Sequence, residues 1–348
     1  MNRDDALAVL GMAEFASQSL DRADAEPWLE RLAEQEDRLH EGLRFFLSEE
    51  EGQLALRMAV ALFPYWRDRG LTADGRAWLS EALEAPGSEI ACELRAKALT
   101  GAAVLAFRQG HDDRAQDLNE EALRVARDCG ERLAEAGALL GLARVSFRTG
   151  DHAAVRTNCE ASLRIAEEVG DLESQASPLH LLAESWRLQG DLGRARDLYG
   201  ASLDVARAIG DDRMISLELH NLAYVDLHDG AIDLAAQGFR DSMVMARRRG
   251  DVTHVAYCVL GLGVVIAELG GWERAVELLG KADSLLERVG ETLDPAEAAE
   301  RERVVAKACE VLGQEACDAA RARGASLSLA DALGKSFRDM ALFSAVED

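Results

Sequence analysis

The chain has 348 residues, of which 48% are hydrophobic and 5% aromatic, and its formal net charge is −24. Nucleic-acid backbones and anionic membranes both repel such a charge, since proteins that bind them gather Lys and Arg. No apolar run is long enough to span a bilayer, so we expect a cytoplasmic protein with no direct nucleic-acid or membrane partner. The six cysteines form no CxxC pair and lie mostly in apolar helical pattern, so we predict that they are reduced core residues.

The first part of the chain is predicted to be helical throughout. Residues 1–48 form an N-terminal helical entry segment, in which 27–47 carry apolar residues at helical spacing. Residues 54–83 continue the pattern, and we assign their tryptophans, Trp66 and Trp78, to the core. No stretch of the sequence predicts a strand, so the fold class is all-α.

A grid of glycines with a spacing of twenty residues dominates the rest of the chain. Glycine ends helices because it adopts the left-handed conformation at little cost. We therefore predict that a helix ends every twenty residues and that forty residues make one helix pair, so that residues 49–290 form a right-handed superhelical solenoid of antiparallel pairs. The glycines of the grid are Gly110, Gly130, Gly150, Gly170, Gly190, Gly210, Gly230, Gly250, Gly270 and Gly290.

Two further positions repeat with the glycines. A small residue follows five positions after every second glycine, as in Ala115, Ala195 and Ala235, with Val155 as a larger member. A small side chain there lets the second helix approach the first closely. Aspartates such as Asp151 come directly after many of the glycines and are predicted to cap the next helix.

Residues 291–348 are predicted to form a C-terminal helical cap. Their last part carries an apolar tail. This tail either caps the end of the array or forms a homodimer interface through the terminal helices. The tail residues are Phe337, Met340, Leu342 and Phe343.

The segment LHLLAESWRLQGDLGRARDLYGASL (179–203) resembles the tetratricopeptide repeat, although that repeat is usually about 34 residues long. Together with segments 27–47, 54–83 and 312–333, it is similar to the C-terminal module of maltose-regulator-like and antibiotic-regulator-like bacterial STAND ATPases. The chain has no GxxxxGK[ST] loop, so the ATPase and DNA-binding parts of those proteins are not carried over. The resemblance implies a sensing and protein-binding module in bacterial regulation.

The first helix of each pair is predicted to line a concave groove. Its arginines suit a carboxylate, and its aromatic residues supply apolar contact area. The predicted binding residues are Arg144, Phe147, Arg148, His180, Glu184, Arg187, His220, Asn221, Tyr224, His228 and Tyr257.

We interpret this groove as a non-catalytic binding site for a peptide or protein partner. One alternative is a sensor of an anionic small molecule. A less favoured one is an enzyme in which His180, His220, Glu184 and Tyr224 do acid–base work. The two histidines occupy equivalent repeat positions, but Glu184 is the only nearby third ligand, so we predict neither a metal nor a cofactor.

Overall fold

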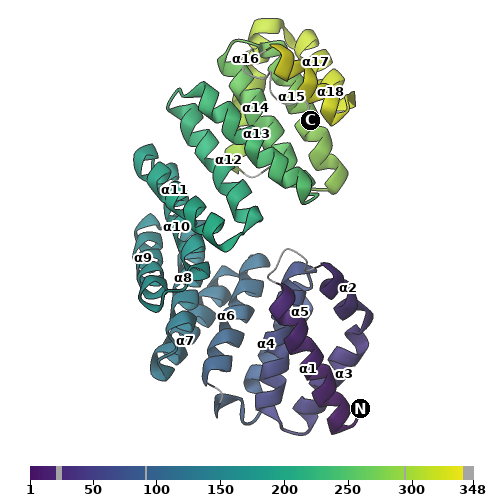
Figure 1. Cartoon of the computed structure of the whole chain (residues 1–348), viewed down its shortest axis with the longest axis vertical. Coiled ribbons are helices and arrows are strands. Elements are labelled where there is room, and N and C mark those ends of the chain that lie inside the picture. Colours follow the sequence, from purple (N-terminus) through teal and green to yellow (C-terminus); the bar gives the residue numbers. More distant parts are fainter. Residues whose placement is uncertain (21–25, 91, 294, 340–348) are drawn as a thin grey trace. The chain divides into compact units, whose positions relative to one another are not determined.

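The computed structural model describes residues 1–20, 26–90, 92–293 and 295–339. Every regular element within these ranges is helical, which confirms the predicted all-α class (Figure 1). The first ten α-helices are α1 (Arg3–Leu20), α2 (Glu26–Glu34), α3 (Glu36–Ser48), α4 (Gly52–Asp68), α5 (Thr72–Glu84), α6 (Cys92–Arg108), α7 (Asp112–Cys129), α8 (Arg132–Arg148), α9 (His152–Val169) and α10 (Glu173–Leu188), with the short 3₁₀ helix η1 (Ser88–Ile90) after α5. The others are α11 (Leu192–Ile209), α12 (Asp212–His228), α13 (Ile232–Arg248), α14 (Val252–Glu268), α15 (Trp272–Val289), α16 (Pro295–Leu312), α17 (Gln314–Ser326) and α18 (Leu329–Asp339).

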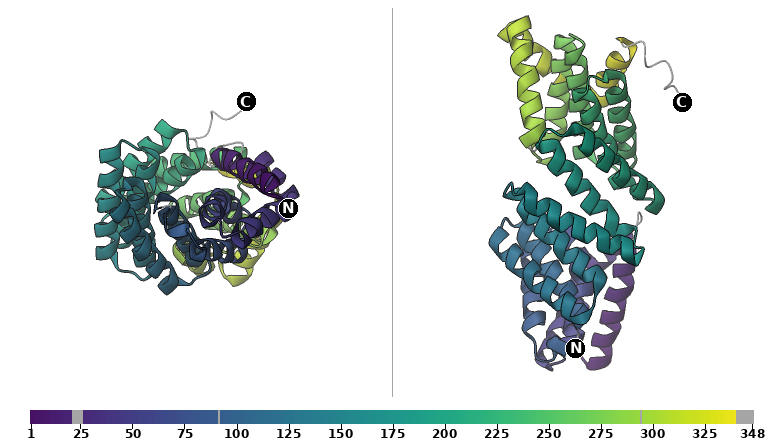
Figure 2. Two further views of the ribbon diagram at one scale, coloured as in Figure 1. Left: turned by 90° about the horizontal axis from the view of Figure 1, so that it is seen from below. Right: turned by 90° about the vertical axis from the view of Figure 1, so that its left-hand side faces the viewer.

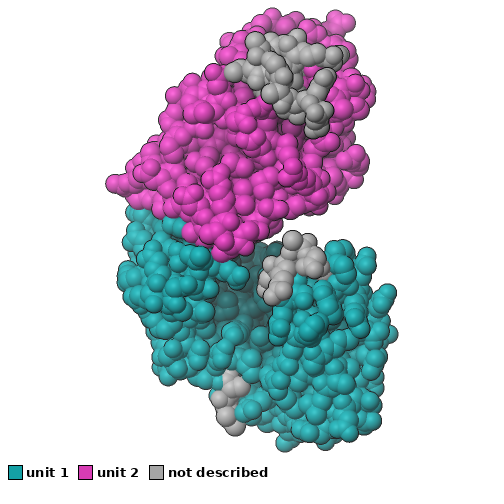
Figure 3. All heavy atoms as spheres, viewed as in Figure 1, with its two compact units in different colours: residues 1–185 teal, residues 186–348 magenta. Residues whose placement is uncertain are grey.

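The helices gather into two compact units, Met1–Ser185 and Trp186–Asp348 (Figure 3). In unit 1, α4 packs on α5, α6 on α7 and α8 on α9, while α1 packs on α3 and α4. In unit 2, α12 packs on α13, and α15 packs on both α14 and α17. Within each unit the pairs stack side by side, as a helical repeat array does (Figure 2).

The ten grid glycines end helices as predicted. All ten have φ between 70° and 82°, the left-handed region that other residues avoid. After Gly150, the amide of Asp151 donates to the Ser146 carbonyl over 2.9 Å, which closes the end of α8. The carboxylate of Asp151 then accepts from the Ala154 amide at the start of α9. The predicted caps are therefore confirmed, and two consecutive residues end one helix and begin the next.

The small residues of the repeat lie where the helices approach each other. Ala115, Val155, Ala195 and Ala235 are fully buried, and Trp66 is only 1% exposed. These burials confirm the predicted core positions, whereas Trp78 is only partly buried against the core.

Several helix contacts leave no room for a methyl group. A Cβ atom at Gly141 would collide with the side chain of Asn119, and one at Gly261 with the ring of Phe239. These glycines let α8 and α14 approach the helices that precede them in sequence.

The cysteine prediction is wrong for four of the six residues. Cys92 pairs with Cys129 and Cys309 with Cys317, with Cα–Cα distances of 6.1 and 5.2 Å that suit disulfides. The spacing of each pair gives no signal in the sequence, because tertiary packing brings the partners together. Cys159 and Cys258 are free and buried, as predicted.

Two other expectations concern the surface. None of the helices in the described part of the chain is both long and apolar enough to cross a bilayer. Of the predicted apolar tail, Met340, Leu342 and Phe343 lie outside the described residues.

Candidate binding surface

Five of the predicted groove residues belong to unit 1. Arg144, Phe147 and Arg148 lie on α8, and His180 and Glu184 lie on α10, so all five come from first helices of their pairs. Arg148 is exposed, and the other four side chains are half-buried. Unit 1 is hollowed on the face shown in Figure 3.

Arg148 is already engaged within unit 1. Its Nη1 donates to the Phe107 carbonyl over 2.9 Å and contacts the carboxylate of Asp112, and its guanidinium carbon lies 3.4 Å from the centre of the Phe107 ring. Arg108, one repeat earlier, donates in the same way to the Arg67 carbonyl over 2.7 Å. These arginines join one helix pair to the pair before it, a structural role that the sequence analysis did not assign to Arg148.

In unit 2, Arg187 donates from Nε to the hydroxyl of Tyr199 over 3.2 Å. Next to it in sequence, the ring of Trp186 lies 4.3 Å from the guanidinium carbon of Arg194. Arg187 is half-buried and contributes to the packing of α10 on α11.

The predicted residues of α12 lie deeper than a groove lining requires. His220 is 2% exposed, Tyr224 5% and Asn221 7%. The His220 ring has the rings of Tyr224 and Phe239 within 5.3 Å, centre to centre. His228, at the end of the same helix, is exposed.

Helix α16 and the segment before it cover this part of unit 2. The Glu297 Oε1 lies 3.5 Å from the His220 Nε2, and the Glu300 Oε1 lies 3.7 Å from the His228 Nε2. Tyr257 donates to the Thr292 carbonyl over 3.3 Å. Three predicted binding residues of unit 2 therefore contact the chain's own C-terminal part, which repeat spacing does not reveal because α16 lies beyond the glycine grid.

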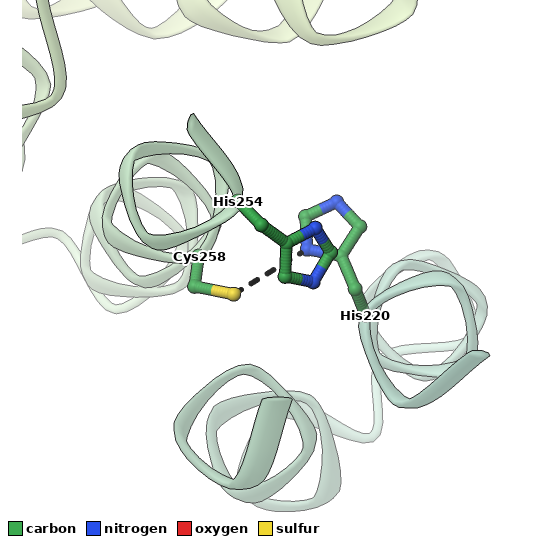
Figure 4. Close-up of side chains that lie close together, drawn as sticks. All are labelled: His220, His254 and Cys258. Carbon is green, nitrogen blue, oxygen red and sulfur yellow. Dashed lines mark hydrogen bonds between the residues drawn. The ribbon is translucent and has the colours of Figure 1, made fainter. Parts of the chain in front are cut away.

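A buried polar cluster connects α12 with α14. His220 comes from α12, His254 and Cys258 come from α14, and the Cys258 Sγ lies 3.8 Å from the His220 Nδ1 (Figure 4). Burial, together with the nearby His220, lowers the pKa of His254 to about 4. Burial raises the pKa of the Cys258 thiol to about 12. Neither His254 nor Cys258 is a predicted site residue, and their separation of four residues on one helix is the signal in the sequence that could have indicated them.

Comparison with known proteins supports the repeat architecture. The tetratricopeptide repeat model matches residues 135–208, where the sequence resemblance was noted. No curated protein matches the chain in sequence.

Three of the solved structures that are similar to the chain illustrate the likeness. A Rap protein complexed with Competence and Sporulation Factor is 13% identical, with 97% of this chain and 96% of that chain covered and a TM-score of 0.54. The apo quorum sensor NprR from B. thuringiensis is 14% identical, with 98% and 95% covered and a TM-score of 0.58. A Signal Transduction ATPase with Numerous Domains from Pyrococcus horikoshii, which has a tetratricopeptide repeat sensor, is 13% identical, with 93% and 55% covered and a TM-score of 0.52. At such identities the likeness shows the fold alone.

Proposed function

We propose that the chain is a binding module whose α8 and α10 face in unit 1 takes an acidic segment of a partner protein. The observation that carries this proposal is the way unit 2 holds α16. There, His220 and His228 on α12 face carboxylates three residues apart on a helix, Glu297 and Glu300. Since α12 and α10 are equivalent helices of the array, the same mode of binding suits unit 1.

The residues at the equivalent positions carry matching chemistry. His180 precedes His220 by forty residues and shares its repeat position, whereas α10 has Leu188 where α12 has His228. Arg148 on α8 holds that second position, and it also bonds the Phe107 carbonyl and Asp112. Arg144 adds a second cation to α8, and the half-buried ring of Phe147 adds apolar area. Arginine pairs with carboxylates through two parallel hydrogen bonds, which favours an acidic partner over a neutral one.

The comparisons support a regulatory setting. The Rap protein was solved in complex with a named factor, and NprR is a quorum sensor. We extend this to the present chain as a proposal for a role in bacterial regulation or assembly, in which its partner is a peptide or a protein segment.

The test selects peptides from a random-sequence library displayed on phage against the full chain. We expect the selected peptides to be rich in Asp and Glu. Arg144→Gln should weaken their binding about tenfold or more, because a hydrogen bond to a charged group contributes about 1.5–3 kcal/mol. Glu184→Gln should strengthen it, because a carboxylate on the same face repels the peptide.

Arg164→Gln is the matched control, since Arg164 is exposed on α9, the second helix of the same pair. Selected peptides that are neutral or basic would argue against the proposal. So would an affinity that Arg144→Gln and Arg164→Gln change equally.

A further inference from the structure

We propose that His220, His254 and Cys258 form a binding site for a borderline divalent metal ion of the Zn²⁺ class. One ring nitrogen of each histidine and the Cys258 sulfur all lie within 4.8 Å of one another (Figure 4). His254 and Cys258 are separated by four residues on α14, so they share one face of that helix, and His220 faces them from α12. Two packed helices thus hold the three donors.

The donor set matches the metal. Imidazole nitrogen and thiolate sulfur are the usual ligands of Zn²⁺, and sites with three protein ligands keep a fourth position for water or a bound molecule. Zn–N and Zn–S bonds of about 2.0–2.3 Å at tetrahedral angles place ligand atoms roughly 3.3–3.8 Å apart. The distance of 3.8 Å between the Cys258 Sγ and the His220 Nδ1 lies at the upper end of this range. Since the three donor atoms lie within 4.8 Å of one another, they must move inward to reach these separations.

The surroundings of His220 give it the tautomer that a metal requires. Its Nε2 lies 3.5 Å from the Glu297 carboxylate. An ionised carboxylate accepts hydrogen bonds and donates none. The proton of the neutral ring therefore sits on Nε2, and the lone pair of Nδ1 faces the Cys258 sulfur. A carboxylate behind a ligating histidine is the common outer-shell arrangement of metal sites.

Two serines fix the ring of His254 in a similar way. The Ser242 hydroxyl donates to the Ser216 carbonyl over 2.7 Å, and the Ser216 hydroxyl donates to the Ser242 carbonyl over 3.0 Å. Because both hydroxyl protons are used, the Ser242 Oγ accepts from the His254 Nε2 across 2.8 Å. The same hydroxyl lies 3.3 Å from the Cys258 sulfur, so one serine orients two of the three donors.

Binding replaces the thiol proton with the metal. The S–H bond of Cys258 breaks, a bond from the sulfur to the cation forms, and the proton leaves to solvent. His254 is half-buried, unlike its two fully buried partners, and provides the approach from solvent.

The experiment uses the full chain with its disulfides intact, treated with a chelator and dialysed. Titration with Co²⁺ should give one equivalent of binding with a sulfur-to-cobalt charge-transfer band, and Zn²⁺ should displace it and raise the melting temperature. Cys258→Ser should abolish the band, and His254→Gln should weaken binding more than about 100-fold, since loss of an outer-shell partner alone costs 10–100-fold. Glu297→Gln should weaken it roughly tenfold.

Cys159→Ser is the matched control, because Cys159 is the other free, buried cysteine and lies on α9 in unit 1. It should leave the band and the affinity unchanged. A chain that binds no Co²⁺ would overturn the proposal, as would a charge-transfer band that survives Cys258→Ser. Should Cys258→Ser fail to fold in the presence of chelator, unchanged Co²⁺ affinity in His254→Gln overturns it equally.

Discussion

A single methyl group at Gly324 should loosen the C-terminal end of unit 2. A Cβ atom there would collide with the Glu277 carbonyl on α15, and one at Gly280 would collide with the Arg321 carbonyl on α17. Both obstacles are backbone atoms, which cannot rotate away as a side chain would. In Gly324→Ala or Gly280→Ala, α15 and α17 must therefore move apart.

The expected loss follows from two opposing terms. Overpacking costs about 1–3 kcal/mol or more, whereas replacing glycine by alanine inside a helix gains about 0.5–1 kcal/mol. The separation also stretches the ion pair of Arg323 with Glu277, now 3.2 Å, and that of Arg321 with Asp283, also 3.2 Å. We expect a net loss of about 1–2 kcal/mol for either variant.

Urea unfolding of the chain, followed by tryptophan fluorescence, measures this loss, and one of its five tryptophans, Trp272, packs against the cluster between α15, α16 and α17. Hydrogen exchange should show faster opening of α17 in the variant. Gly200→Ala is the control, because a Cβ at Gly200 in α11 meets nothing within 4 Å. It should stabilise the chain by about 0.5–1 kcal/mol. Equal stability of Gly324→Ala and Gly200→Ala would refute the reasoning.

Three other outcomes are expected. Arg148→Ala should lower the free energy of unfolding by about 1 kcal/mol in urea because it loses a carbonyl bond and a ring contact, while the exposed Arg164→Ala should stay within about 0.5 kcal/mol. Burial raises the pKa of the Cys159 and Cys258 thiols to about 12, so iodoacetamide at neutral pH should label both only after unfolding; rapid labelling of the native chain would contradict this. Burial raises the pKa of Tyr65 to about 12, so ultraviolet titration should show a late-titrating tyrosine contribution that Tyr65→Phe removes. Because this folded-state pKa lies above the unfolded value, the stability that Tyr65 contributes should be lost as pH rises between about 10 and 12.

The predictable part of the fold is the part encoded locally. A helix that ends at Gly150 and the cap at Asp151 depend on a few adjacent residues, so the sequence alone determined them. Burial of Ala115 or Ala195 follows from the helical period once the glycines set the boundaries. The same reasoning correctly placed Arg144 and His180 on first helices of their pairs.

The unpredicted part depends on contacts between distant segments. Repeat spacing relates His220 to His180, its equivalent one repeat away, as the candidate metal pair. Within unit 2, His220 contacts His254 and Cys258 on the next first helix of the array and Glu297 on α16. Repeat spacing compares equivalent positions, whereas these contacts join non-equivalent ones.

The glycines that admit bulky neighbours also make the repeats non-interchangeable. Gly261 stands nine residues before Gly270, and its site receives Phe239, which stands nine residues after Gly230. In an earlier repeat, Leu181 stands nine residues before Gly190 and Cys159 stands nine after Gly150. There the larger residue occupies the Gly261 position and the smaller one the Phe239 position. A shuffled chain that set Leu181 against Phe239 would bring two large side chains to one site. Repeats of identical length thus differ in the sizes of the residues that they present to their neighbours. These sizes determine the order in which the repeats can be joined.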